Sequence, residues 1–147
     1  MYSLLKIEQR NKVLKKMAVL LKQESAVLLL ANQTDLKSFD ENDLAMYDRL
    51  KVDHDKIEGM IASLNQLAVQ EDPVGRELFH FTHENGLQIF NRTAAFGTVM
   101  IIYESRPDVT VEAAGIAFKS GNKILLKGGK ESYRSNLTVV DLWHRAL

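Results

Sequence analysis

The stretch Lys127–Ser132, with the sequence Lys-Gly-Gly-Lys-Glu-Ser, combines residue types that suit anion binding. Glycines let a ligand come close to the backbone, and the amide groups at the start of a helix attract anions. Lys119, Lys123 and Arg134 add positive charge nearby in the sequence, and together these features favour a nucleotide or phosphate site. Neither Gly-x-Gly-x-x-Gly nor Gly-x-x-x-x-Gly-Lys-Ser/Thr is present, and Gly-Gly after a strand also forms an ordinary tight turn.

A second candidate is the segment Tyr103–Asp108, with the sequence Tyr-Glu-Ser-Arg-Pro-Asp. Arg106 stands beside a proline at the expected start of a helix, where a planar guanidinium can bind a carboxylate or an acyl phosphate through two parallel hydrogen bonds. The same guanidinium can instead form an ion pair with Glu104 or Glu112. The residues themselves leave both interpretations open.

Each candidate follows a short apolar run. The run Thr98–Ile102 has no polar alternation, which is typical of a strand buried on both faces, and 123–127 is expected to be a second buried strand. Between them, Ala113 to Phe118 follow a helical period. Pro107 suits the first turn of that helix, and Gly121 suits its end, where a residue of positive φ is common.

Ser105 and Asp108 match the spacing of a capping box at the start of this helix. A further helix carries Leu137, Val140 and Trp143, so residues 97–147 form a βαβα unit. A right-handed crossover makes its two strands parallel and adjacent. The loops after them then lie side by side at the carboxyl edge of the sheet, where open α/β sheets bind ligands.

A hairpin is expected before this unit. Asp72–Gly75 breaks the helical period, and the apolar period then changes to two. The segments Leu78–His83 and Leu87–Arg92 flank Asn85-Gly86, a strong signal for a two-residue turn in which both residues have positive φ. That register puts Phe81 opposite Phe90. His80 and His83 point to opposite faces, which excludes a local pair of metal ligands.

The front of the chain is expected to be helical. Apolar residues recur from Val13 to Ala31 at steps of three and four, interrupted near Glu24, and 32–43 is a polar break. Asp53 is a suitable N-cap for a second long helix. The lysines of the first helix fit a solvated face, although a membrane-surface or nucleic-acid helix has the same pattern.

Composition limits the function classes. The 147 residues are 46% hydrophobic and 26% charged, as in a globular domain. Zero formal net charge argues against a nucleic-acid binder. The sequence has no run of 18 apolar residues, and Met1–Lys6 shows no secretory pattern. We therefore expect a cytoplasmic protein without a membrane segment. Zero cysteines exclude disulfides, zinc–thiolate sites and a thiol nucleophile.

Several motifs, in order, resemble the gamma-glutamyl phosphate reductase family, which is also called glutamate-5-semialdehyde dehydrogenase. The resemblance covers the chain from about Asn11 onward. Its motifs are Met46–Leu50, Asp72–Gly75, Asn85–Leu87, Ile102–Thr110, Lys119–Asn122, Leu126–Glu131 and Ser135-Asn136.

This resemblance implies an α/β fold like that of aldehyde dehydrogenases. It assigns 1–72 to an N-terminal helical segment, 73–96 to a β-hairpin of the oligomerisation type, and 97–147 to the first βαβα part of a Rossmann-like NADP-binding domain. It also implies NADPH-dependent reduction of L-glutamyl 5-phosphate to L-glutamate 5-semialdehyde in proline biosynthesis, by a homo-oligomer.

The resemblance also implies site residues. Lys127 corresponds to the lysine that reaches the adenosine ribose, beside Gly128 and Gly129. Lys130 lies where many members of the superfamily have an acidic residue, and a cation there suits the 2′-phosphate of NADP. The segment Tyr103-Glu104-Ser105 corresponds to the superfamily's Pro-Trp-Asn beside the nicotinamide, with Ser105 in place of the oxyanion-binding Asn. Arg106 becomes a ligand for the substrate's phosphate or carboxylate.

In this family a cysteine of a later domain attacks the acyl phosphate, so this chain is expected to be an inactive front part of the enzyme. Two alternatives remain, a non-catalytic assembly module and a phosphate-binding fragment. A two-stranded parallel sheet buries little, and we expect the apolar faces of Val99, Ile101, Ile124 and Leu126 to stay partly open. The isolated chain is therefore expected to self-associate or to be marginally folded.

Overall fold

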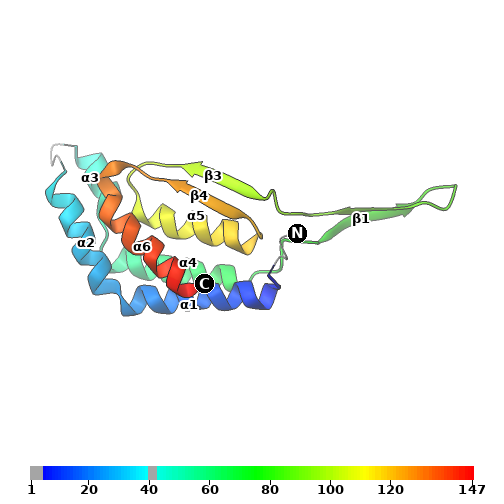
Figure 1. Cartoon of the computed structure of the whole chain (residues 1–147), viewed down its shortest axis with the longest axis horizontal. Helices are drawn as coiled ribbons and strands as arrows, with labels where there is room; N and C mark the ends of the chain where they lie inside the picture. The colour runs from blue at the N-terminus through cyan, green and yellow to red at the C-terminus, as the bar shows by residue number, and fades with distance from the viewer. Residues whose placement is uncertain (1–4, 40–42) are drawn as a thin grey trace.

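The computed structural model describes residues 5–39 and 43–147, so most of the segment tested for a secretory pattern, and positions 40–42 of the expected polar break, lie outside the described residues. Figure 1 shows the elements in chain order. They are α1 (Ile7–Gln23), α2 (Ser25–Lys37), α3 (Leu44–Leu50), α4 (His54–Val69), β1 (Glu77–Thr82), β2 (Gln88–Arg92), β3 (Thr98–Ile102), α5 (Pro107–Lys119), β4 (Lys123–Lys127), the short 3₁₀ helix η1 (Lys130–Ser132) and α6 (Tyr133–Ala146).

The expected interruption at Glu24 is confirmed, because this residue ends α1 and precedes α2. The polar break expected from residue 32 is wrong over its first part, since α2 continues to Lys37. Asn32 and Asp35 are buried there, and their polar groups bond to other elements instead of to water. Helix α3 was not expected from the apolar pattern. At α4, the Asp53 carboxylate accepts a hydrogen bond from the Lys56 amide (3.0 Å), which confirms the predicted cap.

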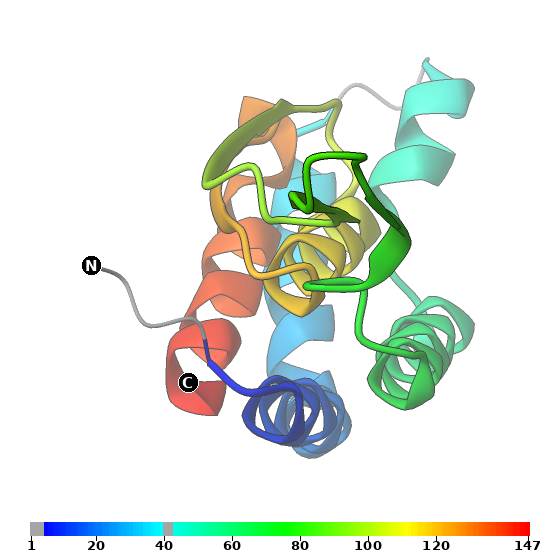
Figure 2. The same cartoon turned by 90° about the vertical axis from the view of Figure 1, so that its right-hand side faces the viewer.

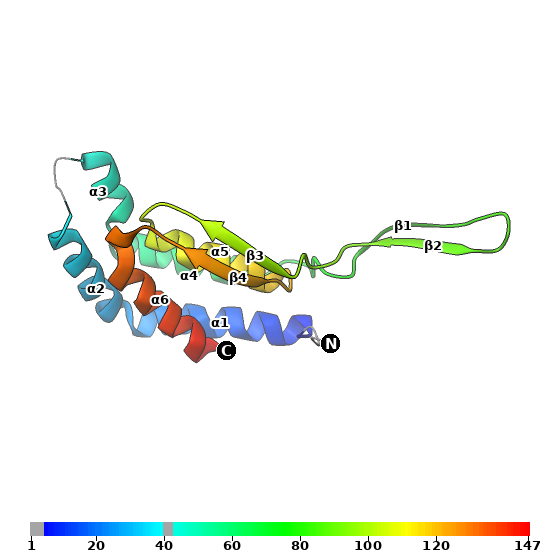
Figure 3. The same ribbon diagram turned by 45° about the horizontal axis from the view of Figure 1, so that its top comes forward.

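One hydrophobic core joins the helices. Its buried side chains come from α1, α2, α4, α5 and α6, with Val52 added from the connection before α4, and Figure 2 shows these helices grouped together at the base of the arm. Helix α5 lies between β3–β4 on one side and α1 with α4 on the other, as Figures 1 and 3 show. In the described part of the chain, no helix is long and apolar enough to span a lipid bilayer.

The parallel pair β3–β4 is confirmed, with Thr98 opposite Lys123 and Ile102 opposite Lys127. Pro107 occupies the first turn of α5, and Gly121 follows the helix with φ +74°. The predicted capping box is wrong, since the N-cap is Arg106 and no side chain caps this helix. The Ser105 hydroxyl bonds to Glu131 instead, a contact that local spacing does not reveal.

Burial of β3 and β4 on both faces is also wrong. Exposure alternates along both strands. The inner side chains Val99, Ile101, Ile124 and Leu126 are half-buried, and Ile124 and Leu126 pack against the helical core. The open face is the opposite one, where Ile102 is 74% exposed and Met100 and Leu125 are also exposed, because the described helices cover one side of the sheet only.

The antiparallel pair β1–β2 forms the expected hairpin, but its predicted register is wrong by one residue. Phe81 lies opposite Ile89, and His80 opposite Phe90. The His83 amide bonds to the Leu87 carbonyl and the Gly86 amide to the His83 carbonyl, so the loop has three residues, with φ +87° at Gly86 only. A type I turn followed by a left-handed glycine is the usual three-residue solution.

This hairpin projects from the body as an arm, which Figures 1 and 3 show from two sides. Every residue of β1 is exposed. Because paired residues share a face, Phe79, Phe81 and Ile89 lie on one side of the arm. The other side carries a polar cluster in which Glu77 bonds to His80 and Arg92, and Phe90 stacks on His80.

Candidate functional site

The two loops singled out from the sequence meet at the carboxyl edge of β3–β4, as predicted. The Tyr103 amide donates to the Lys127 carbonyl (3.1 Å), which extends the strand pairing by one bond. Beyond it, the Ser105 hydroxyl donates to a carboxylate oxygen of Glu131 (2.6 Å). Ser105 is buried, so this bond fixes the first loop against the start of η1.

The glycine pair is explained by this close approach. A methyl group added to Gly128 would lie 2.6 Å from the Asn136 amide nitrogen and 2.9 Å from the Tyr103 hydroxyl. One added to Gly129 would collide with the Ser105 hydroxyl and lie 2.7 Å from Glu131. Other side chains of this chain therefore fill the space that the missing Cβ atoms leave.

A chain of hydrogen bonds supports the second loop from below. The Thr110 hydroxyl donates to the Asn136 carbonyl oxygen (2.8 Å), so the Tyr103 hydroxyl must be the donor in its 2.6 Å contact with Thr110. The Asn136 amide donates to Ser132 (2.8 Å), whose hydroxyl donates to the Gly129 carbonyl (3.2 Å). Partial burial raises the pKa of Tyr103. The phenol therefore stays protonated, as its role as donor to Thr110 requires.

Electrostatics at the loop junction favour an ionised Glu131. The hydrogen bond from Ser105 lowers the pKa of Glu131 first, and its own backbone amide and Lys130 lower it further. The ionised carboxylate of Glu131 thus lies next to the exposed lysines of the loop.

Arg106 and Glu104 lie on the exposed rim. Arg106 donates to the Asp108 carboxylate (2.8 Å), and this contact raises the pKa of its guanidinium. The ion-pair partner of Arg106 is therefore Asp108, and not Glu104 or Glu112, the two acids that the sequence offered as one of two interpretations. Glu104 instead pairs with Arg49 of α3, so this short helix contributes to the site.

The lysines and arginine of the predicted phosphate cluster separate in the fold. Lys127 and Lys130 are exposed at the loop, whereas Lys123 begins β4 and so lies at the opposite end of that strand. Lys119 is buried at the end of α5, where it bonds to Asn11 (2.7 Å) and the Gln70 carbonyl (2.8 Å). Lys119 and Lys123 therefore do not contribute to a phosphate site at this edge.

The amides at the start of α6 already bind an anion. Asp35 of α2 accepts from the amides of Arg134 (3.2 Å) and Ser135 (2.8 Å), and from the Ser135 hydroxyl (2.7 Å). Asp35 is 2% exposed. The helix N-terminus that the sequence suggested for a phosphate is thus occupied by a side chain of the same polypeptide.

The remaining arrangement offers two exposed lysines, Lys127 and Lys130, beside a rigid loop with an ionised carboxylate. Arg134 is also exposed, at the start of α6, where it pairs with Asp35. Such a set can bind phosphate groups and can accept hydrogen bonds from hydroxyl groups. Among the described residues, no group of three His, Asp or Glu side chains is placed to bind a metal ion. Sequence reasoning gave no role to Thr110, Asn136, Glu131 or Arg49, although all four lie within motifs of the resemblance.

Curated relatives match nearly all of this chain. It is 40% identical over 141 residues to a gamma-glutamyl phosphate reductase of Leptospira interrogans, and 43% identical over 137 residues to that of Nautilia profundicola. These alignments cover 95% and 92% of this chain but 34% and 33% of the relatives. The chain resembles the N-terminal third of gamma-glutamyl phosphate reductase.

Two crystal structures of gamma-glutamyl phosphate reductases agree. The Thermotoga maritima structure superposes with a TM-score of 0.92 at 36% identity and covers 97% of this chain and 35% of its own. The Saccharomyces cerevisiae structure gives 0.85 at 31% identity, over 96% and 36%. No protein-family model matches the chain.

Proposed function

We propose that this chain forms the front part of a gamma-glutamyl phosphate reductase, which reduces L-glutamyl 5-phosphate to L-glutamate 5-semialdehyde with NADPH, in the cytoplasm, for proline biosynthesis. The observation that carries the proposal is the match of nearly the whole chain to reductases from several organisms. The chain spans about a third of their length, so the activity belongs to a longer polypeptide. Its parts are a helical segment (1–72), a hairpin (73–96) and the beginning of an NADP-binding domain (97–147).

In this proposal Lys127, Gly128, Gly129 and Lys130 bind the adenosine end of NADP, and Tyr103, Glu104 and Ser105 lie beside its nicotinamide, which supplies the hydride. Ser105 and Arg106 contribute to the substrate site. The exposed cations of the loop suit a ribose 2′-phosphate. The ion pair of Arg106 with Asp108 must open for the guanidinium to grip a substrate anion, whereas Lys127 and Lys130 are exposed.

The proposal includes inactivity of the 147 residues alone. The family's reaction needs a cysteine thiolate, and this chain has no cysteine. The purified chain, incubated with NADP, inorganic phosphate and glutamate 5-semialdehyde, is expected to produce no NADPH. Turnover by a preparation free of host reductase would contradict this.

Cofactor preference can be tested in a chimera that joins residues 1–147 to the remaining two thirds of the Leptospira relative. We expect this chimera to use NADPH, and Lys130→Glu to lower kcat/KM for NADPH at least tenfold while kcat/KM for NADH stays within about twofold. Lys12→Glu, an exposed charge change on α1, serves as the control. Equal losses for both cofactors would contradict the assignment of Lys130.

The arm supports a second role, in homo-oligomer assembly. Phe79 and Phe81 lie about half exposed on a hairpin that the body does not cover, and contiguous exposed apolar surface marks interaction sites. Sedimentation velocity of the purified chain is expected to show concentration-dependent self-association. A monomer at all concentrations would contradict assembly by this chain alone.

A further inference from the structure

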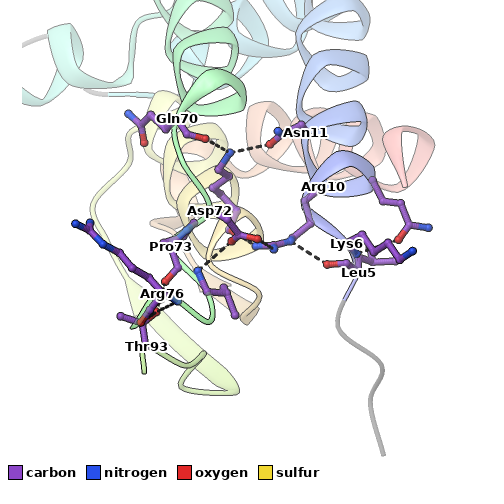
Figure 4. Close-up of polar contacts among 12 residues, drawn as sticks. Leu5, Lys6, Arg10, Asn11, Gln70, Asp72, Pro73, Arg76 and Thr93 are labelled. Carbon is purple, nitrogen blue, oxygen red and sulfur yellow. Dashed lines mark hydrogen bonds and ion pairs between the residues drawn. The ribbon is translucent and has the colours of Figure 1, made fainter. Parts of the chain in front are cut away.

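Two buried cations lie at the base of the arm. Arg10 of α1 and Lys119 of α5 are each 2% exposed. They lie where the start of α1, the end of α5 and the linker from α4 to β1 meet, and Figure 4 shows the Arg10 side of this junction. Charges are rarely buried to this degree without a specific arrangement of partners. This junction is separate from the loops at the sheet edge.

The Arg10 guanidinium connects three segments. Its Nε donates to the Leu5 carbonyl (3.0 Å), one terminal nitrogen donates to the Lys119 carbonyl, and the other donates to the Asp72 carboxylate (2.7 Å). The five donors of a guanidinium lie in one rigid plane, so these partners are held in a fixed relation to each other. Asp72 is the one of them that belongs to the arm's incoming linker.

Asp72 also shapes that linker. Its second carboxylate oxygen accepts from the Val74 amide (2.9 Å), a local turn that directs the chain from Pro73 towards β1. The Asp72 carboxylate therefore binds the body through Arg10 and also sets the direction in which the chain leaves the body.

The two linkers of the arm are joined to each other at Thr93. Its hydroxyl donates to the Pro73 carbonyl (2.7 Å) and accepts from the Arg76 amide (2.9 Å), and its carbonyl accepts from the Gly75 amide (2.9 Å). The linkers must consequently move together.

The outgoing linker has its own attachment at Gly97. The Gly97 amide donates to the Asn122 side chain (3.0 Å), and its carbonyl accepts from the Lys123 amide (2.7 Å). The joined linkers are thus fixed to the body at Asp72 on one side and Gly97 on the other. A unit attached at two points keeps its angle, whereas a unit attached at one point can rotate about it.

We propose that the ion pair between Arg10 and Asp72 fixes the angle at which the arm leaves the body. Arg10 is buried and Asp72 is partly exposed, and a partly buried ion pair adds little net stability, because desolvation offsets the attraction between its charges. Its contribution here is directional. If the arm joins copies of the chain, as the proposed function holds, the pair presents the Phe79–Phe81 face in one orientation.

The angle can be measured by pulsed electron paramagnetic resonance. The chain has no cysteine, so Glu84→Cys at the tip of the arm and Lys15→Cys on α1 provide two specific spin-label sites. Labelled chain is diluted tenfold into unlabelled chain, so that the distances are intramolecular even in an oligomer. The test variants are Asp72→Asn, which removes the charge, and Asp72→Ser, which keeps an acceptor for the Val74 amide but cannot reach Arg10.

We expect a narrow distance distribution in the parent and a distribution at least twice as wide in both variants. Glu24→Gln removes an arginine–carboxylate pair with Arg145 away from the arm, and is expected to leave the width unchanged. An Asp72→Ser distribution as narrow as the parent's would overturn the proposal.

Far-UV circular dichroism establishes that each variant keeps its helices. A variant that loses them is replaced by Arg10→Met, which breaks the same pair from α1 and is judged by the same criterion. The distance measurement is independent of self-association. If the chain stays monomeric and the distance distribution still widens in the variants, the result would contradict the proposed assembly role and support the fixed angle.

Discussion

Leu21 in the helical body and Leu87 in the arm are the same side chain in opposite surroundings. Leu21 is 0% exposed within the core formed by five helices, whereas Leu87 is 56% exposed beside the hairpin turn. The body buries a core of apolar side chains, although others on its helix surfaces, such as Leu30 and Ile116, and those on the open face of β3–β4 are exposed. The arm does not, since most of its large apolar side chains face solvent on both sides.

The body therefore supplies most of the folding free energy, whereas the arm supplies exposed apolar surface for association. A two-stranded hairpin is marginal on its own, so the arm adds little to the folding free energy. Substitutions in the body should act on folding, and matched substitutions in the arm should act on association.

The largest expected effect is that of Leu21→Ala, because it removes a fully buried side chain and leaves a cavity. We expect a loss of about 2–5 kcal/mol in the free energy of unfolding, measured by urea denaturation. Leu87→Ala, the same substitution in the arm, should cost less than about 0.5 kcal/mol. Equal losses would mean that the arm folds as part of the core.

The next effect is expected at Asp35, which is buried and caps α6 from α2. Asp35→Ala leaves two amides and a hydroxyl without their acceptor, at a cost of about 2–3 kcal/mol in the free energy of unfolding. Asp141→Ala is the control, since its exposed pair with Arg145 contributes about 0–1 kcal/mol. A loss at Asp35 no larger than that at Asp141 would show that water replaces these bonds.

Phe81→Ser should affect association more than folding. The side chain is half-exposed on the apolar side of the arm, so we expect the self-association constant to fall about tenfold while the melting temperature of the dilute chain changes by less than about 2 °C. Thr82→Ser, on the other side of the arm, should leave both unchanged. Sedimentation velocity and thermal melting measure the two quantities, and unchanged self-association in Phe81→Ser would contradict the assigned face.

The smallest effect concerns the sheet edge and depends on pH. The pKa of Glu131 lies below its ordinary value of 4.5, mainly because Ser105 donates to it. The contribution of the ionised Glu131 carboxylate to the free energy of unfolding is therefore complete above pH 4.5, and it is lost as the pH falls through the lowered pKa. Ser105→Ala should cost about 1 kcal/mol at pH 7, and the difference should shrink below pH 4.5. The Ser120 hydroxyl donates to backbone carbonyls and accepts from the Asn122 side-chain amide, so it has no ionisable partner, and Ser120→Ala should show no such pH dependence.

Local patterns predicted most of the long elements, although they missed α3. The parallel strands, the Asp53 cap and the positive φ at Gly86 followed from periodicity and turn chemistry. The hairpin register did not, because Glu84 is acceptable both as a strand end and as a loop residue, and one added loop residue shifts every cross-strand pair.

Three predictions from local patterns were wrong because contacts between distant residues decide these positions. Ser105 has the type and spacing of a cap, but Glu131, 26 residues later, takes its hydroxyl. Lys119 has the type of a phosphate ligand, but Asn11 and Gln70 bury it on the other side of the molecule from the loop. The start of α6 has the geometry of an anion site, but Asp35 fills it. In each case the competing partner becomes a neighbour only after the chain has folded.

The cap that Asp35 provides for α6 also sets an order of events during synthesis. Asp35 and Asn32 bond to residues made about a hundred positions later, since Asp35 meets Ser135 and Asn32 meets the Ser135 hydroxyl. The chain emerging from the ribosome cannot close such contacts until α6 has left the exit tunnel. The apolar face of α2, whose main partner is α6, stays uncovered until then, whereas α1 can already pack against α4.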